Sequence, residues 1–166
     1  LAVEHKLLLR PTARWLRCPE VLLVHHNGRT FEMSADCAAL PEGLHYAEVE
    51  ALDSAAPWRG PLFRVPVTVV KPSAPSAAPY LAAFPGLAFT AGREHRRFVA
   101  VPEGATWCEL RLTSEGDAQA PCSYFVRTTQ LLPGARFSDG EGARSYVQLG
   151  FGQKWSQAFR VRGGTL

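Results

Sequence analysis

Apolar side chains recur at every second residue in this chain, and outside one Pro- and Ala-rich segment no stretch carries them at helical spacing. The clearest alternation runs through residues 62–70, which place four apolar side chains on one face: Phe63, Val65, Val67 and Val69. Successive side chains of a β-strand point to opposite faces of a sheet, so a period of two predicts strands with one buried face. The pattern favours an all-β fold.

The same reading predicts short strands over residues 21–24, 29–33, 44–52, 62–70, 97–101, 106–112, 123–131, 146–149 and 155–161. The pair Asn27–Gly28 suits a tight turn and should join the strands at 21–24 and 29–33 in a hairpin. Pro66 has no backbone N–H, so its strand should lie at a sheet edge or carry a bulge. The glycine-rich residues 138–142 are expected to form a loop.

Residues 71–85 divide the chain, because they include four prolines and five alanines and no periodic apolar face. We expect a β-sandwich module over residues 1–71, a linker over 72–85 and a second β module over 86–166. About five strands are predicted after the linker, whereas a closed jelly roll has about eight. The second module is therefore expected to be incomplete, with the strand at 122–131 or at 155–161 lying at an interface.

The charge distribution speaks against a nucleic-acid partner. The chain has a net charge of +3, its basic residues are scattered, and their densest group, residues 93–97, includes Glu94. Nucleic-acid-binding surfaces usually carry basic residues on one face, interspersed with aromatic side chains that stack on the nucleobases. We therefore interpret residues 93–97 as a solvated strand edge. No apolar run approaches the ~18 residues of a membrane-spanning helix, and the first residues lack the pattern of a secretory signal.

The cysteine pattern indicates a reducing compartment, and so a cytoplasmic location. None of the four cysteines forms a Cys-x-x-Cys motif: Cys18, Cys37, Cys108 and Cys122. The single asparagine, Asn27, is not part of a glycosylation sequon. We expect four free thiols that are mostly buried and act as small apolar side chains.

The sequence carries no catalytic motif that we can identify. A Gly-x-Ser-x-Gly nucleophile motif and a phosphate-binding glycine loop are both absent. The serine–glycine clusters at 114–116 and 138–140 have the composition of turns. Asp53 is expected to cap a helix or to close an Asx turn. We therefore expect no catalytic and no cofactor-binding residue.

A metal site is conceivable only at His25 and His26, together with Cys18 and Cys37. Adjacent strand residues point to opposite faces, so the two histidines cannot both ligate one ion without a special turn. The spacing to the two cysteines matches no compact zinc pattern. We expect the histidines to flank a turn and expect no metal.

Two stretches resemble one known family. Residues 43–69 read Gly-Leu-His-Tyr-x-Glu-Val and then, after an Asp and a Pro turn, Gly-Pro-Leu-Phe-Arg-Val-Pro-Val-Thr. This is similar to the non-catalytic region behind the protease domain of tripeptidyl-peptidase II. Residues 96–107 resemble the start of the next module of that family, and residues 15–20 and 159–164 also fit. The chain departs from the family pattern at residues 36–39, Asp-Cys-Ala-Ala, where Asp-Pro-x-Gly is expected.

The resemblance implies an Ig-like, or fibronectin-like, β-sandwich followed by part of a galactose-binding-like jelly roll. It implies a parent that is a large cytosolic subtilisin-type serine exopeptidase, which removes tripeptides from free N-termini and forms large homo-oligomers. No position in this chain matches the catalytic motifs of that family. The chain is therefore expected to be non-catalytic, to pack against the protease domain and other modules of its parent, and to support assembly.

The alternative is a carbohydrate- or protein-binding β-sandwich module without a peptidase context. Galactose-binding-like jelly rolls often hold sugars on an exposed aromatic ring, although fold analogy alone is a weak argument for binding. Trp107 and Trp155 lie in predicted strands and are expected to be core residues, whereas Trp58, in a predicted turn, is the candidate for an exposed ring.

Overall fold

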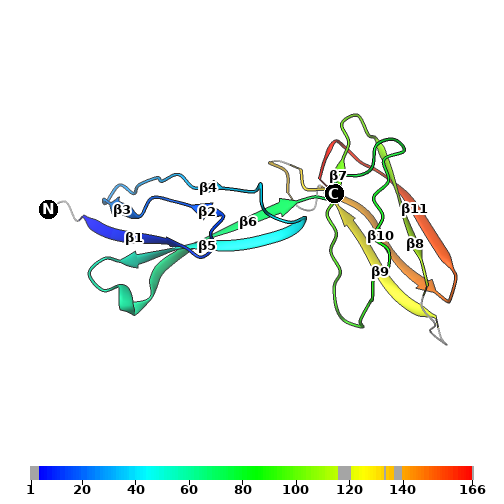
Figure 1. Cartoon of the computed structure of the whole chain (residues 1–166), viewed down its shortest axis with the longest axis horizontal. Coiled ribbons are helices and arrows are strands. Elements are labelled where there is room, and N and C mark those ends of the chain that lie inside the picture. Colours follow the sequence, from blue (N-terminus) through cyan, green and yellow to red (C-terminus); the bar gives the residue numbers. More distant parts are fainter. Residues whose placement is uncertain (1–3, 116–120, 133, 137–139, 166) are drawn as a thin grey trace. The chain divides into compact units, whose positions relative to one another are not determined.

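Antiparallel strands make up nearly all of the regular structure in the computed structural model, which confirms the all-β fold. The structure describes residues 4–115, 121–132, 134–136 and 140–165. The chain divides into two units, Leu1–Lys71 and Pro72–Leu166 (Figure 1). None of the helices in these described ranges is long and apolar enough to cross a membrane.

Unit 1 is built on a four-stranded antiparallel sheet with the order β3-β1-β5-β6. Its strands are β1 (His5–Pro11), β3 (Val21–Val24), β5 (Gly43–Asp53) and β6 (Pro61–Lys71). A short second pair consists of β2 (Leu16–Arg17) and β4 (Ser34–Ala35), and a 3-10 turn, η1 (Pro57–Arg59), precedes β6.

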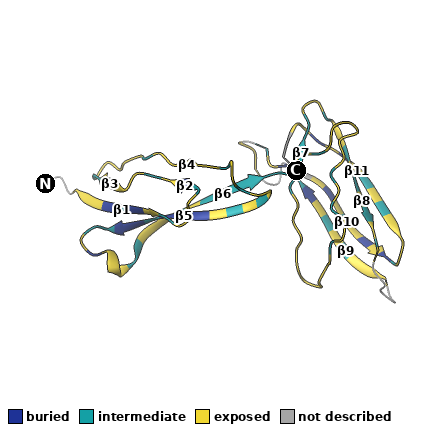
Figure 2. Ribbon diagram, in the orientation of Figure 1, coloured by how far each residue is buried: buried dark blue, intermediate teal, exposed yellow. Residues whose placement is uncertain are grey.

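The core of unit 1 lies on one face of this sheet, as the alternation predicts for β5. In β6, Val65 and Val67 pack against this core, whereas Phe63, which was expected on the same face, is exposed. Ala47, Val49 and Ala51 of β5 are buried, together with leucines of β1, β2 and β3: Leu7, Leu9, Leu16 and Leu22 (Figure 2). Each Val or Leu side chain that is fully removed from water contributes ~1.5–3 kcal/mol, so this face provides the main stabilisation of the sheet.

The position of Pro66 is confirmed. Strand β6 lies at the edge of the sheet, and Pro66 is paired there with Glu48 of β5. At an edge, one side of the strand has no neighbour to accept a hydrogen bond, so the missing N–H of a proline costs little.

The hairpin predicted around Asn27–Gly28 is wrong. The turn itself exists, since the Gly28 N–H donates to the His25 carbonyl at 2.9 Å, but residues 29–33 form no strand. Strand β3 pairs with β1 instead, in a register that sets Leu22 opposite Leu7. This pairing buries both leucines in one core, whereas Phe31 of the next segment packs on that core from outside the sheet.

Over the described residues of unit 2, the strands form three antiparallel pairs, β9–β10, β8–β11 and β7–β12. Their bounds are β7 (Ala100–Val101), β8 (Trp107–Thr113), β9 (Cys122–Thr129), β10 (Glu141–Leu149), β11 (Lys154–Arg160) and β12 (Gly164–Thr165). A core of Ala143, Phe159 and Val161 is covered by Cys108 and Leu110 of β8. The Ser145 hydroxyl donates to Gln157 Oε1 at 2.6 Å and so links β10 to β11.

Two local predictions in unit 2 need correction. Residues 93–97 are exposed in irregular backbone and not on a strand edge; only Ala100–Val101 of the predicted strand at 97–101 forms β7. The glycine-rich loop predicted at 138–142 ends earlier than expected, because β10 begins at Glu141; Ser138 and Asp139 lie outside the described residues. Gly142 fits this strand because Phe159 and Thr128 crowd the place where a Cβ atom would stand.

Candidate interaction surface

The outward face of the β9–β10 pair carries an exposed group of aromatic and arginine side chains. We name it the β9–β10 face, and it comprises six exposed residues that oppose one another in three register pairs: Ser123 and Gln148, Phe125 and Tyr146, Arg127 and Arg144. The alternation of β10 explains the placement, since Ala143, Val147 and Leu149 point inward and are buried.

The two aromatic rings of this face contact each other in the open. The ring centroids of Phe125 and Tyr146 are 4.8 Å apart at an interplanar angle of 37°. The guanidinium of Arg144 lies 5.7 Å from the centre of the Phe125 ring, within cation–π range. Tyr146 is nevertheless 84% exposed and Phe125 49% exposed. A solvated strand face normally carries polar residues, so this aromatic pair is suited to a contact with another surface.

A second exposed ring, Trp107, lies at the start of β8 and corrects the expectation that it is a core residue. It is 59% exposed, and Arg160, its register partner on β11, lies 5.6 Å above the ring. Trp107 shares the outward face of β8 with Glu109 and Arg111, both exposed. The sequence contained this signal, because those charged residues follow Trp107 at a period of two.

Trp107 borders a hollow of about 490 Å³, which is lined by Thr106, Trp107, Gln130, Leu132, Gly140, Gly142, Arg160, Val161 and Arg162. Gln130 is buried, and its side-chain amide both donates a hydrogen bond to the backbone of Arg162 and accepts one from it. Gln130 Nε2 donates to the Arg162 carbonyl at 2.7 Å, and the Arg162 N–H donates to Gln130 Oε1 at 2.9 Å. The wall of the hollow is thus fixed, while Trp107 and the arginines remain accessible.

Trp58 and Trp155, the other two tryptophans that the sequence analysis considered, are placed as follows. Trp58 lies in η1 and is 78% exposed, which confirms the exposure expected for it. Trp155 of β11 is half-buried.

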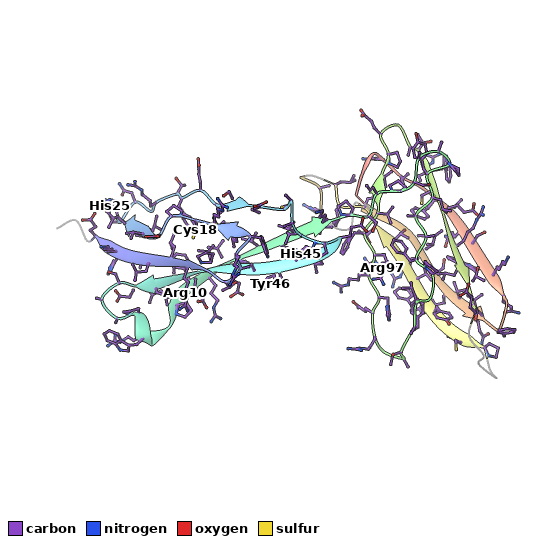
Figure 3. All side chains as sticks on the ribbon, in the orientation of Figure 1. Arg10, Cys18, His25, His45, Tyr46 and Arg97 are labelled. Carbon is purple, nitrogen blue, oxygen red and sulfur yellow. The ribbon has the colours of Figure 1, made fainter. Side chains whose placement is uncertain are left out.

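The residues of the conceivable metal set do not form a site. His25 Nε2 lies 3.9 Å from Glu4 Oε1, and His26 is exposed. Figure 3 shows Cys18 and His25 at separate places along unit 1. Over the described ranges, no group of three or more His, Cys, Asp or Glu residues is arranged to hold a metal ion.

None of the four cysteines forms a disulfide, but the expectation that they are mostly buried is wrong. Cys122 is exposed, and Cys18, Cys37 and Cys108 are only half-buried. Burial raises the pKa of the Cys18 and Cys108 thiols, which favours the protonated, unreactive form. Asp53 closes the expected Asx turn, since its Oδ1 accepts the Ala55 N–H at 2.9 Å.

A network of paired charges covers the outward face of β5 in unit 1, which the sequence did not reveal. Glu50 accepts from Arg10 Nη2 at 2.7 Å and lies 3.5 Å from Arg64 Nε. Glu48 lies 3.4 Å from the same Arg64 nitrogen and accepts the Tyr46 hydroxyl at 2.5 Å. That hydrogen bond raises the pKa of Tyr46, while the hydrogen bond from Arg10 lowers the pKa of Glu50. These carboxylates are therefore already neutralised within the unit.

Comparison with known proteins places both units in one family. Residues 1–70 match the model of the first Ig-like domain of tripeptidyl-peptidase II, and residues 89–166 match the model of its galactose-binding domain-like region. Tripeptidyl-peptidase 2 of rice is 44% identical over 71% of this chain and 9% of its own length. The protein of the same name from Caenorhabditis elegans is 30% identical over 99% of this chain and 12% of its own length.

A solved structure agrees with this assignment. The crystal structure of tripeptidyl peptidase 2 superposes with a TM-score of 0.83 at 29% identity and covers 98% of this chain and 14% of the solved chain. The chain thus spans about a tenth of the length of the curated relatives it matches. From its two domains and these relatives, the chain belongs to the tripeptidyl-peptidase II family.

Proposed function

We propose that this chain is a non-catalytic packing and assembly region of a longer, cytoplasmic serine tripeptidyl-peptidase of the subtilisin type. The parent would remove tripeptides from free N-termini, with its catalytic residues outside these 166 residues. The relatives carry the name tripeptidyl-peptidase 2, and the stretches matched by this chain make up only 9% and 10% of their lengths, which supports this division of labour.

The observation that carries the proposal is the accessible surface of the chain, which is 12289 Å². A single compact body of this mass would expose roughly 8,100 Å², and two separate compact halves would together expose roughly 9,800 Å². The accessible surface of the chain exceeds even the value for two separate bodies. The placement of the two units relative to each other therefore does not account for the difference. Surface of this extent, with exposed rings such as Tyr146 and Trp107, is suited to being covered by other modules or copies of the parent.

We also propose the division of the chain into an Ig-like module over 1–71, a connection over 72–85 and an incomplete jelly roll over 86–166. The extents of the two family matches support it. The connection is partly ordered by unit 2, since the Ser73 N–H donates to the Phe98 carbonyl at 2.8 Å and its own carbonyl accepts from Ala100 at 2.9 Å.

The test is made on the isolated chain by light scattering and by the binding of a dye that fluoresces on apolar surface. We expect dye binding, and we expect the double variant Phe125→Ser/Tyr146→Ser to reduce it. The matched control is Tyr80→Ser, which removes an exposed ring from irregular backbone. A monomer that binds no dye would overturn the proposal and favour an autonomous interaction module.

A second candidate function is carbohydrate binding, which the hollow beside Trp107 favours. Sugars are held by a ring face beside polar donors, and here Arg160 and Arg162 adjoin the exposed indole. Calorimetric titration with galactose and related sugars tests this function. Binding that is lost in Trp107→Ala but retained in Trp58→Ala would support it, and an absence of heat at millimolar sugar would exclude it.

A further inference from the structure

We propose that the β9–β10 face is a docking surface for an acidic protein segment that carries an aromatic side chain two residues away from a carboxylate. This inference rests on the proposed function in one respect: the segment would come from another module of the parent. The aromatic pair, Phe125 and Tyr146, supplies apolar contact area, and the arginine pair beside it selects the charge of the partner.

Among the six residues that define the face, the charged side chains are both basic. Its six outward residues include Arg127 and Arg144 and no acidic residue. Unit 2 as a whole holds ten basic and seven acidic residues, whereas unit 1 holds eight of each, so the net charge of +3 belongs to unit 2. A carboxylate-bearing partner is thus favoured both by the face and by the field of the unit around it.

A second copy of this chain is less favoured as the partner on grounds of charge. Unit 1 is neutral, and the carboxylates that lie together on its β5 strand, Glu48 and Glu50, are already paired with Arg10 and Arg64. Unit 2 of a second copy carries the same sign of charge as the face itself. On grounds of charge, we therefore assign the complementary segment to another module of the parent.

The geometry favours a protein partner over a nucleic acid. Phe125 is contacted by Tyr146 and by the Arg144 guanidinium, so its ring faces are partly occupied and offer little room for a stacked base. Arginine forks pair well with carboxylates. Alternate residues of an extended peptide lie about 6.8 Å apart on one face, the same spacing that separates the arginine pair from the aromatic pair along β9 and β10.

The experiment uses the 166-residue chain and a short peptide, acetyl-Ser-Glu-Gly-Phe-Gly-Glu-Ser-amide. In extended form, this peptide presents its two glutamates and its phenylalanine on one face. Titration is followed by the backbone amide shifts of the chain in an NMR spectrum. We expect weak binding, with a Kd of about 1 mM, because the contact is small. The shifted amides should lie in residues 123–127 and 144–148.

Variants and a second peptide make the result specific. Arg144→Glu should weaken binding about tenfold, since it removes an attraction and adds a repulsion. Arg111→Glu, which reverses an exposed charge on the outward face of β8, should leave binding unchanged. A peptide with lysine in place of both glutamates should not bind. Tyr146 is so exposed that Tyr146→Ser should weaken binding without altering the thermal unfolding of the chain.

Several outcomes would overturn the inference. These are shifts that map elsewhere, no shifts at millimolar peptide, equal binding of the lysine peptide, or a stronger response to an oligouridine RNA. Self-association of the chain that Arg144→Glu abolishes would assign the face to a second copy and also contradict it. Because the titration needs no parent protein, its failure leaves the dye-binding test of the proposed function intact.

Discussion

At the scale of single residues, Lys71 contacts the turn at residues 36–40, which lacks the Asp-Pro-x-Gly motif of the family pattern. Its ammonium donates to the carbonyls of Cys37, Ala38 and Leu40 at 3.2, 3.1 and 2.5 Å. Asp36 Oδ1 accepts the Ala38 N–H at 3.2 Å in the same turn. Three backbone acceptors thus converge on one cation, which holds this turn without the Pro and Gly of the family pattern.

Replacing this cation tests that role. Lys71→Met keeps much of the side-chain volume but leaves the three carbonyls without their donor, so the free energy of unfolding of unit 1 should fall by about 1–3 kcal/mol. Urea denaturation, followed by the exchange protection of the β5 and β6 amides, measures the change. Lys6→Met, at an exposed position of β1, is the matched control, and an equal effect of both substitutions would refute the role of Lys71.

Glu50 predicts a dependence of stability on pH. The hydrogen bond from Arg10 holds the pKa of the Glu50 carboxyl below its usual range in the folded chain. A lowered folded pKa adds stability above the unfolded pKa, and this stability is lost as the pH falls through the folded pKa.

Glu50→Gln should therefore lower the urea midpoint of unit 1 slightly at pH 7, and the difference from the unaltered chain should close as the pH falls below the ordinary glutamate range. Glu32→Gln, at an exposed residue between β3 and β4, should shift the midpoint at neither pH. If the difference in urea midpoint between Glu50→Gln and the unaltered chain stays constant from pH 7 into the acid range, the ionised Glu50 carboxylate does not contribute to the stability of unit 1.

At the scale of elements, β10 shows how a strand is shaped by its neighbours. Its register with β9 shifts between Glu141 and Arg144. Within this irregularity, a Cβ on Gly142 would lie 2.7 Å from Thr128 Oγ1 and 3.1 Å from Phe159 Cδ2. Thr128 Oγ1 cannot move away freely, because it accepts the Ala143 N–H at 2.6 Å. The close approach of β10 to β9 and β11 therefore requires glycine.

Gly142→Ala should destabilise unit 2 by about 1–3 kcal/mol through this overpacking. Thermal unfolding monitored by near-ultraviolet circular dichroism reports the loss through the tryptophans of unit 2. Gly150→Ala is the control, since a Cβ there meets Gln153 only at 3.6 Å, an ordinary contact distance. A Gly142→Ala chain as stable as the Gly150→Ala chain would show that β10 can shift to admit the methyl group.

At the scale of the whole molecule, the proposed role rests on the exposed surface of the chain. Its exposed rings lie on strand faces, in turns and in irregular backbone, and the hollow beside Trp107 combines an indole with two arginines. Acyl transfer by a serine peptidase needs a nucleophile, a base and an orienting acid in one place. The proposed division of labour gives that arrangement to another part of the parent.

The isolated chain should therefore release no tripeptide from a fluorogenic tripeptide amide, with a rate equal to that of the buffer blank. A full-length tripeptidyl-peptidase 2 under the same conditions serves as the positive control. Release that a serine-directed inhibitor abolishes, from a preparation free of other proteases, would refute the non-catalytic assignment.

Much of the fold could be predicted because the period-two pattern acts locally. Strands β5 and β6, with Ala47, Val49 and Ala51 on the buried face and Pro66 at the edge, follow from alternation and from the missing N–H of proline. Trp107 shows how the same pattern can be misread. Its outward position follows from the period of two that it shares with the charged residues Glu109 and Arg111. The prediction that Trp107 is a core residue instead followed the general tendency of large aromatic rings to be buried.

The sequence alone determined the all-β class, the two-part organisation and the family, because alternation, proline-rich composition and motif are properties of neighbouring residues. Only the tertiary structure decided which strands pair. Strand β3 pairs with β1, where Leu22 and Leu7 are buried together, and not with residues 29–33 across the nearest turn. The β9–β10 face likewise depends on register, which brings Phe125 beside Tyr146 and Arg127 opposite Arg144. Such pairings join residues far apart in the sequence, and their free energy comes from contacts that no local pattern encodes.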